Sequence, residues 1–224
     1  MACALPHHLL FFLLLLFLLS FSIVAQTNGT ANVGTYITAN NKDTPWLSTF
    51  GVFAFGFKPL EGKNLFLLCI WYHQIPNQTI VWYGYDGVPV SIGSKLGLIV
   101  DRGLVLNDPK GKELWNSQPI LNNDTYGFMN DTGNFVLVRS DSFYLWESFK
   151  NPTDTMLSTQ IMEFGGVIFS RLSETNFSQG RFQLHFLPDG NLVRNTRDIT
   201  TNFAYDAYYI NNTYDPSNSS NSGY

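Results

Sequence analysis

The sequence predicts an all-β fold built from a repeated strand unit, and three observations support this. Trp82, Trp115 and Trp146 recur at intervals of 33 and 31 residues, and each follows a valine or a leucine. Short apolar runs end at clusters of Gly, Pro, Asn or Asp, which is typical of strands and turns. No stretch longer than two turns has the apolar period of an amphipathic helix. A period near 30 residues indicates one supersecondary unit that buries its apolar face only against its neighbours.

The first expected strands lie on either side of Trp82. Residues 53–57 (Phe-Ala-Phe-Gly-Phe) stop at Lys-Pro, residues 65–72 form an apolar run that stops before Ile-Pro-Asn, and residues 79–83 stop before Asp-Gly. Proline and glycine at these points favour turns because they break strand pairing. Aromatic residues make up 16% of the chain, which favours strands and a well-filled core.

The later expected strands continue the same pattern to the end of the repeat and beyond it. They are 104–107 before Asp-Pro-Lys-Gly, then 135–139, 143–146, 181–186 and 192–194. Many short strands at this spacing indicate an antiparallel sandwich, barrel or prism.

Residues 1–25 are expected to be a secretory signal. The segment 9–24 is apolar apart from two serines, and it is shorter than the roughly 20 residues of a membrane span. Ala25 suits a cleavage site. The alternative is an uncleaved signal anchor, since the first residues contain no Lys or Arg. No basic flank or stop-transfer pattern follows, which favours cleavage.

The composition argues against nucleic acid binding, a disulfide framework and a reactive thiol. The net charge is −4 and only 13% of residues are charged, so no basic stripe is present to bind a nucleic acid backbone. Cys69 is the one cysteine after the signal, and no disulfide framework is expected. It lies in an apolar run without a His or cationic neighbour, so we expect a small buried hydrophobe rather than a reactive thiol.

Seven Asn-x-Ser/Thr acceptors predict a glycosylated, secreted or cell-surface protein, because N-glycans are attached along the secretory route. They are Asn28, Asn77, Asn123, Asn130, Asn176, Asn211 and Asn218.

A domain boundary is expected near the turn-forming cluster 150–154. We expect a first domain over 26–149 and the start of a second copy over 150–224, where residues 181–193 repeat the strand and turn pattern. The polar stretch 215–224 offers no further strands. The chain is therefore expected to be a fragment, or an early-terminated form, of a longer protein.

Four segments resemble the extracellular part of plant bulb-type (G-type) lectin receptor-like serine/threonine kinases and the related S-locus glycoproteins. They are Phe-Ala-Phe-Gly-Phe at 53–57, Thr-Ile-Val-Trp-Tyr at 79–83, Asp-Thr-Gly-Asn-Phe-Val-Leu at 131–137, and Trp-Glu-Ser-Phe-Lys-Asn-Pro-Thr-Asp-Thr-Met-Leu at 146–157. The resemblance implies a bulb-type lectin β-prism: three four-stranded antiparallel sheets around a pseudo-threefold axis, with one tryptophan per sheet, followed here by an incomplete second copy. The family's kinase, membrane-spanning and Cys-rich segments are absent from this sequence.

Sugar-binding bulb lectins read mannose with the row Gln-x-Asp-x-Asn-x-Val-x-Tyr, whose alternate residues would share one face of a strand. The resemblance places three such rows in this chain, and each departs from the pattern. They are Ile99, Asp101, Gly103, Val105 and Asn107; then Asn130, Thr132, Asn134, Val136 and Val138; and finally Leu187, Asp189, Asn191, Val193 and Asn195. The third keeps Asp189, Asn191 and Val193, a candidate weakened mannose site. The alternative is that Asp-Gly-Asn is only the turn that feeds a strand.

No catalytic set is predicted. The two histidines after the signal, His73 and His185, have no Cys, His or Asp partners at metal-ligand spacing. Glu113 and Glu147 occupy equivalent places in the repeat, which suits surface positions better than a glycosidase pair. We therefore expect no enzyme, no cofactor and no metal.

The leading hypothesis is a recognition module, secreted or on the outer side of the plasma membrane, that binds a protein, peptide or glycan and could pair with another receptor ectodomain. The alternatives are a secreted mannose-binding lectin and, remotely, a secreted hydrolase.

Overall fold

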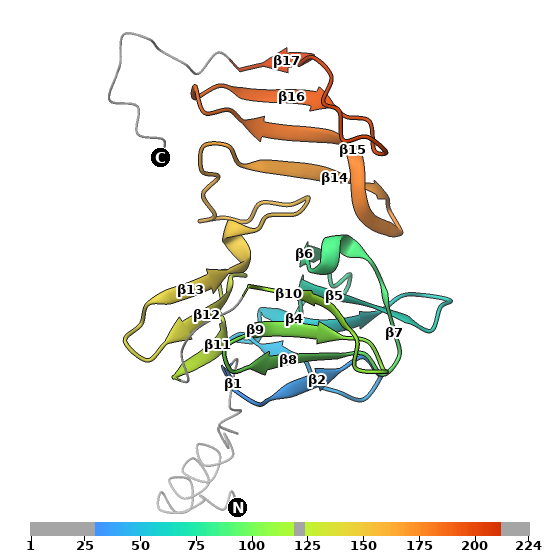
Figure 1. Ribbon diagram of the computed structural model, residues 1–224, viewed down its shortest axis with the longest axis vertical. Coiled ribbons are helices and arrows are strands. Elements are labelled where there is room, and N and C mark those ends of the chain that lie inside the picture. The colour runs from blue at the N-terminus through green and yellow to red at the C-terminus, as the bar shows by residue number, and fades with distance from the viewer. Residues whose placement is uncertain (1–29, 119–123, 212–224) are drawn as a thin grey trace, which may run out of the picture.

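Four antiparallel sheets account for nearly all regular structure in the computed structural model, which describes residues 30–118 and 124–211 (Figure 1). Three of these sheets draw on residues 30–147 and enclose one core. Sheet A has the order β1 (Thr30–Asn32), β11 (Thr125–Met129), β12 (Phe135–Arg139) and β13 (Tyr144–Glu147). Sheet B has the order β2 (Tyr36–Thr38), β8 (Lys95–Ile99), β9 (Gly103–Asn107) and β10 (Glu113–Asn116).

Sheet C has the same arrangement with one added strand. Its order is β3 (Trp46–Leu47), β4 (Phe53–Pro59), β5 (Leu65–Tyr72) and β6 (Ile80–Tyr83), and β7 (Val90–Ser91) also pairs with β5. In each of the three sheets, three strands that follow one another in sequence are completed by a short strand from residues 30–47. This shared strand order is the predicted threefold repeat, and it confirms the predicted all-β prism of antiparallel sheets.

The core of the prism is formed by alternate side chains of the central strands. Phe55, Leu68 and Ile70 come from sheet C, Leu96, Leu98, Leu104 and Leu106 from sheet B, and Met129, Phe135 and Leu137 from sheet A. All are at most 1% exposed. Full burial of each such side chain contributes about 1.5–3 kcal/mol to the free energy of folding, and these contacts hold three sheets together without a disulfide.

The tryptophan repeat closes one end of this core. Trp82, Trp115 and Trp146 lie on β6, β10 and β13, so each sheet contributes one, as predicted. The Trp82 and Trp146 rings meet edge to face at 5.9 Å and 80°, and the Trp115 and Trp146 rings at 6.4 Å and 74°. Their strand partners are Ile70, Leu106 and Leu137. All three strand pairs contain a register shift, so the local geometry repeats along with the sequence.

Buried serine side chains repeat two residues after two of the tryptophans. The Ser117 hydroxyl accepts a hydrogen bond from the Leu104 N–H at 3.0 Å, and the Ser148 hydroxyl accepts one from the Phe135 N–H at 2.9 Å. Gly84 holds the equivalent place after Trp82, where an added Cβ would lie 3.0 Å from the Leu68 side chain. Sheet C therefore departs from its two counterparts at this end of the prism.

Sheet D stands beyond the tryptophan end of the prism (Figure 1). Its order is β14 (Val167–Ser173), β15 (Asn176–Phe186), β16 (Leu192–Thr196) and β17 (Tyr209–Ile210). Among the described residues, helical geometry is limited to two 3-10 turns, η1 (Tyr85–Gly87) and η2 (Ser148–Lys150). Within residues 30–118 and 124–211, this agrees with the sequence, in which no stretch longer than two turns has the apolar period of an amphipathic helix.

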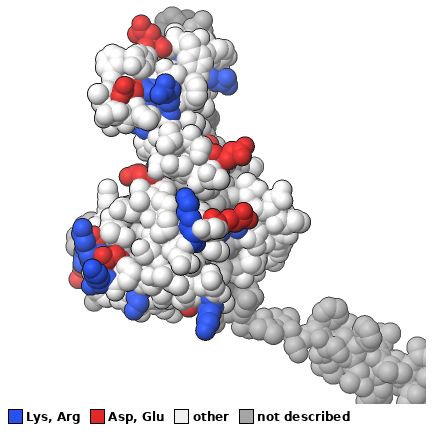
Figure 2. Space-filling model, turned by 90° about the vertical axis from the view of Figure 1, so that its right-hand side faces the viewer, with Lys and Arg blue, Asp and Glu red and all other residues white. Residues whose placement is uncertain are grey.

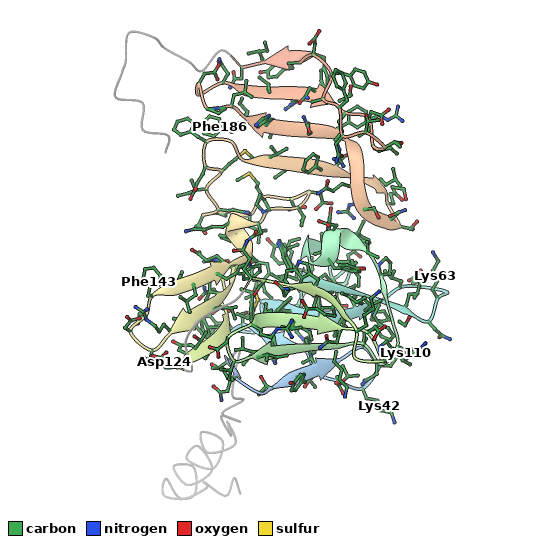
Figure 3. The ribbon with its side chains drawn as sticks, in the orientation of Figure 1. Lys42, Lys63, Lys110, Asp124, Phe143 and Phe186 are labelled. Carbon is green, nitrogen blue, oxygen red and sulfur yellow. The ribbon has the colours of Figure 1, made fainter. Side chains whose placement is uncertain are left out.

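Charged side chains are sparse on the face seen in Figure 2, where small groups of both signs are separated by uncharged surface. Lys42, Lys63 and Lys110 lie at one rim of the prism and extend away from it (Figure 3). On the face seen in Figure 2 the positive charges do not form a continuous basic surface.

Candidate functional site

The three predicted rows do not lie on single strands, because each crosses a tight turn. Arg102 N–H donates to the Ile99 carbonyl at 3.1 Å, Gly133 N–H to the Asn130 carbonyl at 3.1 Å, and Gly190 N–H to the Leu187 carbonyl at 3.0 Å. The first residue of each row therefore lies before the turn, and only the last three follow it. From the sequence, alternate residues of each row are expected to share one face of a single strand. The tight turn within each row prevents this, because it separates the first residue from the last three.

In sheet A, both polar atoms of the asparagine side chain in the row form hydrogen bonds within the protein. Asn134 is buried, and its Nδ2 donates to the Glu147 carboxylate at 2.9 Å. Its Oδ1 accepts from the Ser148 hydroxyl and from the Phe149 N–H, both at 3.1 Å. Asn134 thus ties the start of β12 to the end of β13 and to η2. The two valines that follow it in the row, Val136 and Val138, are 0% and 3% exposed.

In sheet B, the row has lost the asparagine altogether. Gly103 takes its place with a positive φ of 71°, and Val105 is fully buried. Arg102 and Glu113 form an ion pair beside this row, and Glu113 also accepts a hydrogen bond from the Asn116 amide at 2.6 Å. The polar groups next to the row therefore bind one another.

The third row lies in sheet D, outside the prism. Asp189 Oδ1 accepts from the Asn191 N–H at 2.9 Å, and Asp189 Oδ2 accepts from the Asn191 amide at 3.0 Å. These hydrogen bonds hold the pKa of the Asp189 carboxyl below its usual value. Val193 is only 6% exposed. Asp189 and Asn191 are therefore close to each other, but Val193 does not offer an apolar surface beside them.

The outer face of sheet C is apolar and covered by another part of the chain. Ala54, Leu67, Cys69, Trp71 and Tyr83 form a second buried cluster, separate from the core of the prism, together with Phe177 of β15. The Phe177 and Tyr83 rings meet edge to face at 5.5 Å. Cys69 is equivalent to Val105 and Val136, because each immediately precedes the strand partner of a repeat tryptophan. The face that corresponds to the lectin row is an internal contact here.

Several contacts fix sheet D at this position. The Arg171 guanidinium lies 4.7 Å from the centre of the Phe177 ring and donates to the Asp154 carboxylate at 2.6 Å. At Gly87, φ is +73° and an added Cβ would meet the backbone of Phe177. Burial at this contact, with the nearby Asp154 carboxylate, raises the pKa of Tyr83 to about 12. The Phe177 contact was not predicted, although the unbroken apolar run 65–72 is a signal for a strand that is buried on both faces.

The outer faces of sheets A and B remain uncovered by sheet D and contain aromatic side chains. On sheet A, Phe128 pairs with Val136, and Tyr126 pairs with Val138, which in turn pairs with the exposed Tyr144. On sheet B, the half-exposed ring of Tyr36 lies over Gly97, where an added Cβ would collide with it. Phe143 extends from the turn before β13 (Figure 3).

Four of the seven predicted glycan acceptors lie within the described residues. Asn77, Asn176 and Asn211 are exposed, and Asn130 is partly buried beside the sheet A row. Asn28, Asn123 and Asn218 lie outside the described residues. Asn176 immediately precedes the buried Phe177, so a glycan there would stand at the edge of the contact between sheets C and D.

The described part of the chain holds no group of three or more His, Cys, Asp or Glu residues that could bind a metal ion. Cys69 is fully buried, and burial raises the pKa of its thiol, as expected for a packing residue rather than a nucleophile. No helix within residues 30–118 and 124–211 is long and apolar enough to cross a membrane.

The known proteins to which this chain is similar include lectins and receptor-like kinases whose names contain the word lectin. Residues 79–179 match the model of the D-mannose binding lectin family, a non-catalytic domain. The G-type lectin S-receptor-like serine/threonine-protein kinase LECRK3 of Oryza sativa subsp. indica is 39% identical over 93% of this chain and 27% of its own length. RLK1 of Arabidopsis thaliana, which has the same family description, is 38% identical over 97% of this chain and 28% of its own length.

Among solved structures, the Japanese Marasmius oreades lectin aligns with 54% of this chain and 90% of its own, at 15% identity and a TM-score of 0.41. The chain spans about a quarter of the length of the curated relatives that it matches. Over nearly all of its own length, this chain is similar to the bulb-type lectin region of the G-type lectin S-receptor-like kinases, as its sequence motifs predicted.

Proposed function

We propose that this chain is a non-catalytic extracellular recognition module that binds a protein or peptide through the outer faces of sheets A and B. The outer face of sheet C is excluded from this role because Phe177 and its neighbours cover it.

The state of Asn134 is the observation that carries the proposal. A lectin row needs its asparagine to bind sugar hydroxyls, yet both polar atoms of this amide are bound to Glu147, Ser148 and Phe149. Sheet B has Gly103 at the same place. Each hydrogen bond contributes about 0.5–1.5 kcal/mol net, so losing the row removes most of what a polyol ligand would gain.

The aromatic side chains of these faces favour a different ligand. Tyr126, Phe128 and Tyr144 on sheet A and Tyr36 on sheet B offer the large, partly apolar surfaces that are enriched in protein interfaces. Tyr36 and Tyr144 are 53% and 47% exposed. An extended peptide or a loop of a partner ectodomain can bury such side chains without a row of hydroxyl-binding amides.

A secreted mannose-binding lectin is the second candidate, with its site at Asp189, Asn191 and Val193. Passing the full chain over immobilised mannose separates the two functions. We expect the protein to flow through, because Asp189 is already bound to Asn191 and Val193 is buried. Retention that free mannose elutes, and that Asn191→Ala abolishes, would instead establish the lectin site.

The extracellular placement rests on residues 1–25 as a secretory signal and on glycosylation at Asn28, Asn77, Asn123, Asn130, Asn176, Asn211 and Asn218. The division into a lectin domain at 26–149 and the start of a second lectin-like domain at 150–224 belongs to the same proposal. Pairing of this module with the ectodomain of another receptor belongs to the same proposal. The similarity to receptor-like kinases supports the extracellular placement.

A further inference from the structure

A cavity of about 240 Å³ lies at the tryptophan end of the prism, where the prism meets sheet D. It is distinct from the outer faces of sheets A and B. Six aromatic side chains line it: Trp82, Tyr83, Tyr85, Trp115, Trp146 and Phe169. This volume is below the 300–1,000 Å³ of pockets for drug-sized molecules, so the ligand would be a single small group.

The Trp146 ring is steeply inclined to the two other tryptophan rings of the wall. Trp146 is inclined at 80° to Trp82 and at 74° to Trp115. Aromatic rings that face different directions can surround a compact group. A flat sugar ring, in contrast, stacks best on a single exposed aromatic face. The electron-rich faces of tryptophan attract a cation that lies within about 6 Å of the ring centre.

The charge of the lining has one sign. Asp86 is the charged residue among the described residues that line the cavity. It is exposed on the 3-10 turn η1, and its charge is one of the influences that raise the pKa of Tyr83. A carboxylate at the rim disfavours an anionic ligand and attracts a cation.

The other charged side chains near the cavity already form ion pairs or stack on an aromatic ring. Asp154 binds Arg171, and Glu147 pairs with Lys150 at 3.5 Å. Arg197, which does not line the cavity, stacks on Phe169 at 4.4 Å and donates to Gln179 at 3.0 Å. The Phe169 ring therefore already binds one cation. The positive charge of Arg197 also repels a cationic ligand in the cavity.

We propose that this cavity is an aromatic cage for an ammonium group, formed by Trp82, Trp115 and Trp146 with Asp86 at its rim. The ammonium could belong to a small free amine or to a lysine side chain of a bound peptide. Thr153 also lines the cavity, and its buried hydroxyl is a second polar group that a primary ammonium would meet there.

Tryptophan fluorescence of the full chain tests the proposal, because three of its tryptophans line the cavity. The protein is titrated with tetramethylammonium chloride at fixed chloride concentration, and in parallel with neopentyl alcohol, a neutral molecule of similar shape. We expect a saturable change with the cation and binding of the alcohol about two- to thirtyfold weaker. Equal responses to the two molecules would overturn the cage, as would a saturable response to methyl mannoside alone.

A matched pair of variants isolates the carboxylate. Asp86 and Asp101 both have left-handed backbones, with φ of 50° and 58°, so Asn is equally tolerated at both. We expect Asp86→Asn to weaken tetramethylammonium binding at least about threefold and Asp101→Asn to leave it unchanged. If both variants keep the wild-type melting temperature and affinity, Asp86 has no part in the site and the proposal fails.

The source of the ammonium is resolved with lysine derivatives. Nα-acetyl-lysine methylamide stands for a peptide lysine, and the same compound acetylated at Nε is its neutral counterpart. Binding of the charged form alone identifies a peptide lysine as a ligand, whereas binding of tetramethylammonium without either derivative identifies a free amine. Tighter binding of the neutral derivative would contradict the cage.

Discussion

Asn134 matches the lectin motif in sequence, but in the structure its amide makes internal hydrogen bonds. Its position after Asp-Thr-Gly matches the lectin row, but its amide joins β12, β13 and η2 through three hydrogen bonds. The sequence predicted the residue and its place in the repeat. It could not reveal that Glu147, Ser148 and Phe149 lie within bonding distance, because that depends on how β13 turns into η2.

We expect Asn134→Ala to lower the free energy of unfolding by about 1–3 kcal/mol, since it leaves buried polar groups without partners. Thermal or urea unfolding measures this loss. Asn116→Ala, at an exposed asparagine that ends β10 in sheet B, is the control and should change stability by less than about 1 kcal/mol. An Asn134→Ala protein of wild-type stability would show that the hydrogen bonds are not structural.

Tyr83 gives a pH dependence whose direction follows from its pKa. Burial raises this pKa to about 12 in the folded chain, above the ordinary value near 10. Between about pH 10 and pH 12 the unfolded chain therefore binds fewer protons than the folded one, and stability falls as the pH rises. We expect this part of the alkaline loss to disappear in Tyr83→Phe, as measured by melting temperatures from pH 8 to pH 12. The same alkaline slope in both proteins would contradict the assignment.

Among the elements, the β14–β15 pair decides which face of the prism is available. Phe177 near the start of β15 enters an apolar cluster on sheet C, and the Asp154–Arg171 ion pair stands beside it. The run 65–72 already signalled two buried faces. What would cover the second face could not be predicted, because Phe177 follows β5 by more than a hundred residues.

We expect Phe177→Ala to loosen sheet D without unfolding the prism. Truncating a buried phenylalanine costs about 3–5 kcal/mol, and here the loss falls on the contact between sheets C and D. Hydrogen exchange should therefore rise in residues 167–210 and little in β8, β9 and β12. Phe182→Ala, which removes a 55% exposed ring from the same sheet, serves as the control. Equal exchange in both variants would refute the role of Phe177.

Two physical reasons explain several of the strands that the sequence missed. β8 and β11 contain Gly97 and Gly127 at their centres, and glycine disfavours strands. The structure needs glycine there because the Tyr36 ring covers Gly97, and Gly127 packs against Phe135 and Ala31. The strands β1, β2, β3 and β7 have only two or three residues, too few for a periodic signal, and they exist because neighbouring strands pair with them.

In the molecule as a whole, the prism and sheet D differ in how they are stabilised. The prism buries one shared core from three sheets, whereas sheet D leaves large side chains such as Phe182, Tyr208 and Tyr209 about half exposed. The cavity lies where these two parts meet. Recognition through sheets A and B and the proposed ammonium cage therefore use different parts of the molecule, and their tests can succeed or fail separately.

The all-β class, the repeat of three units, the tryptophan in each unit and the resemblance to bulb-type lectins could be predicted from the order of residues alone. These features are local or periodic, so a single chain displays them directly. The folded structure was needed to show that Asn134 is bound internally, that Phe177 covers sheet C and that three tryptophans form the wall of a cavity. Each of these depends on side chains far apart in sequence meeting at particular distances and angles, which the order of residues does not state.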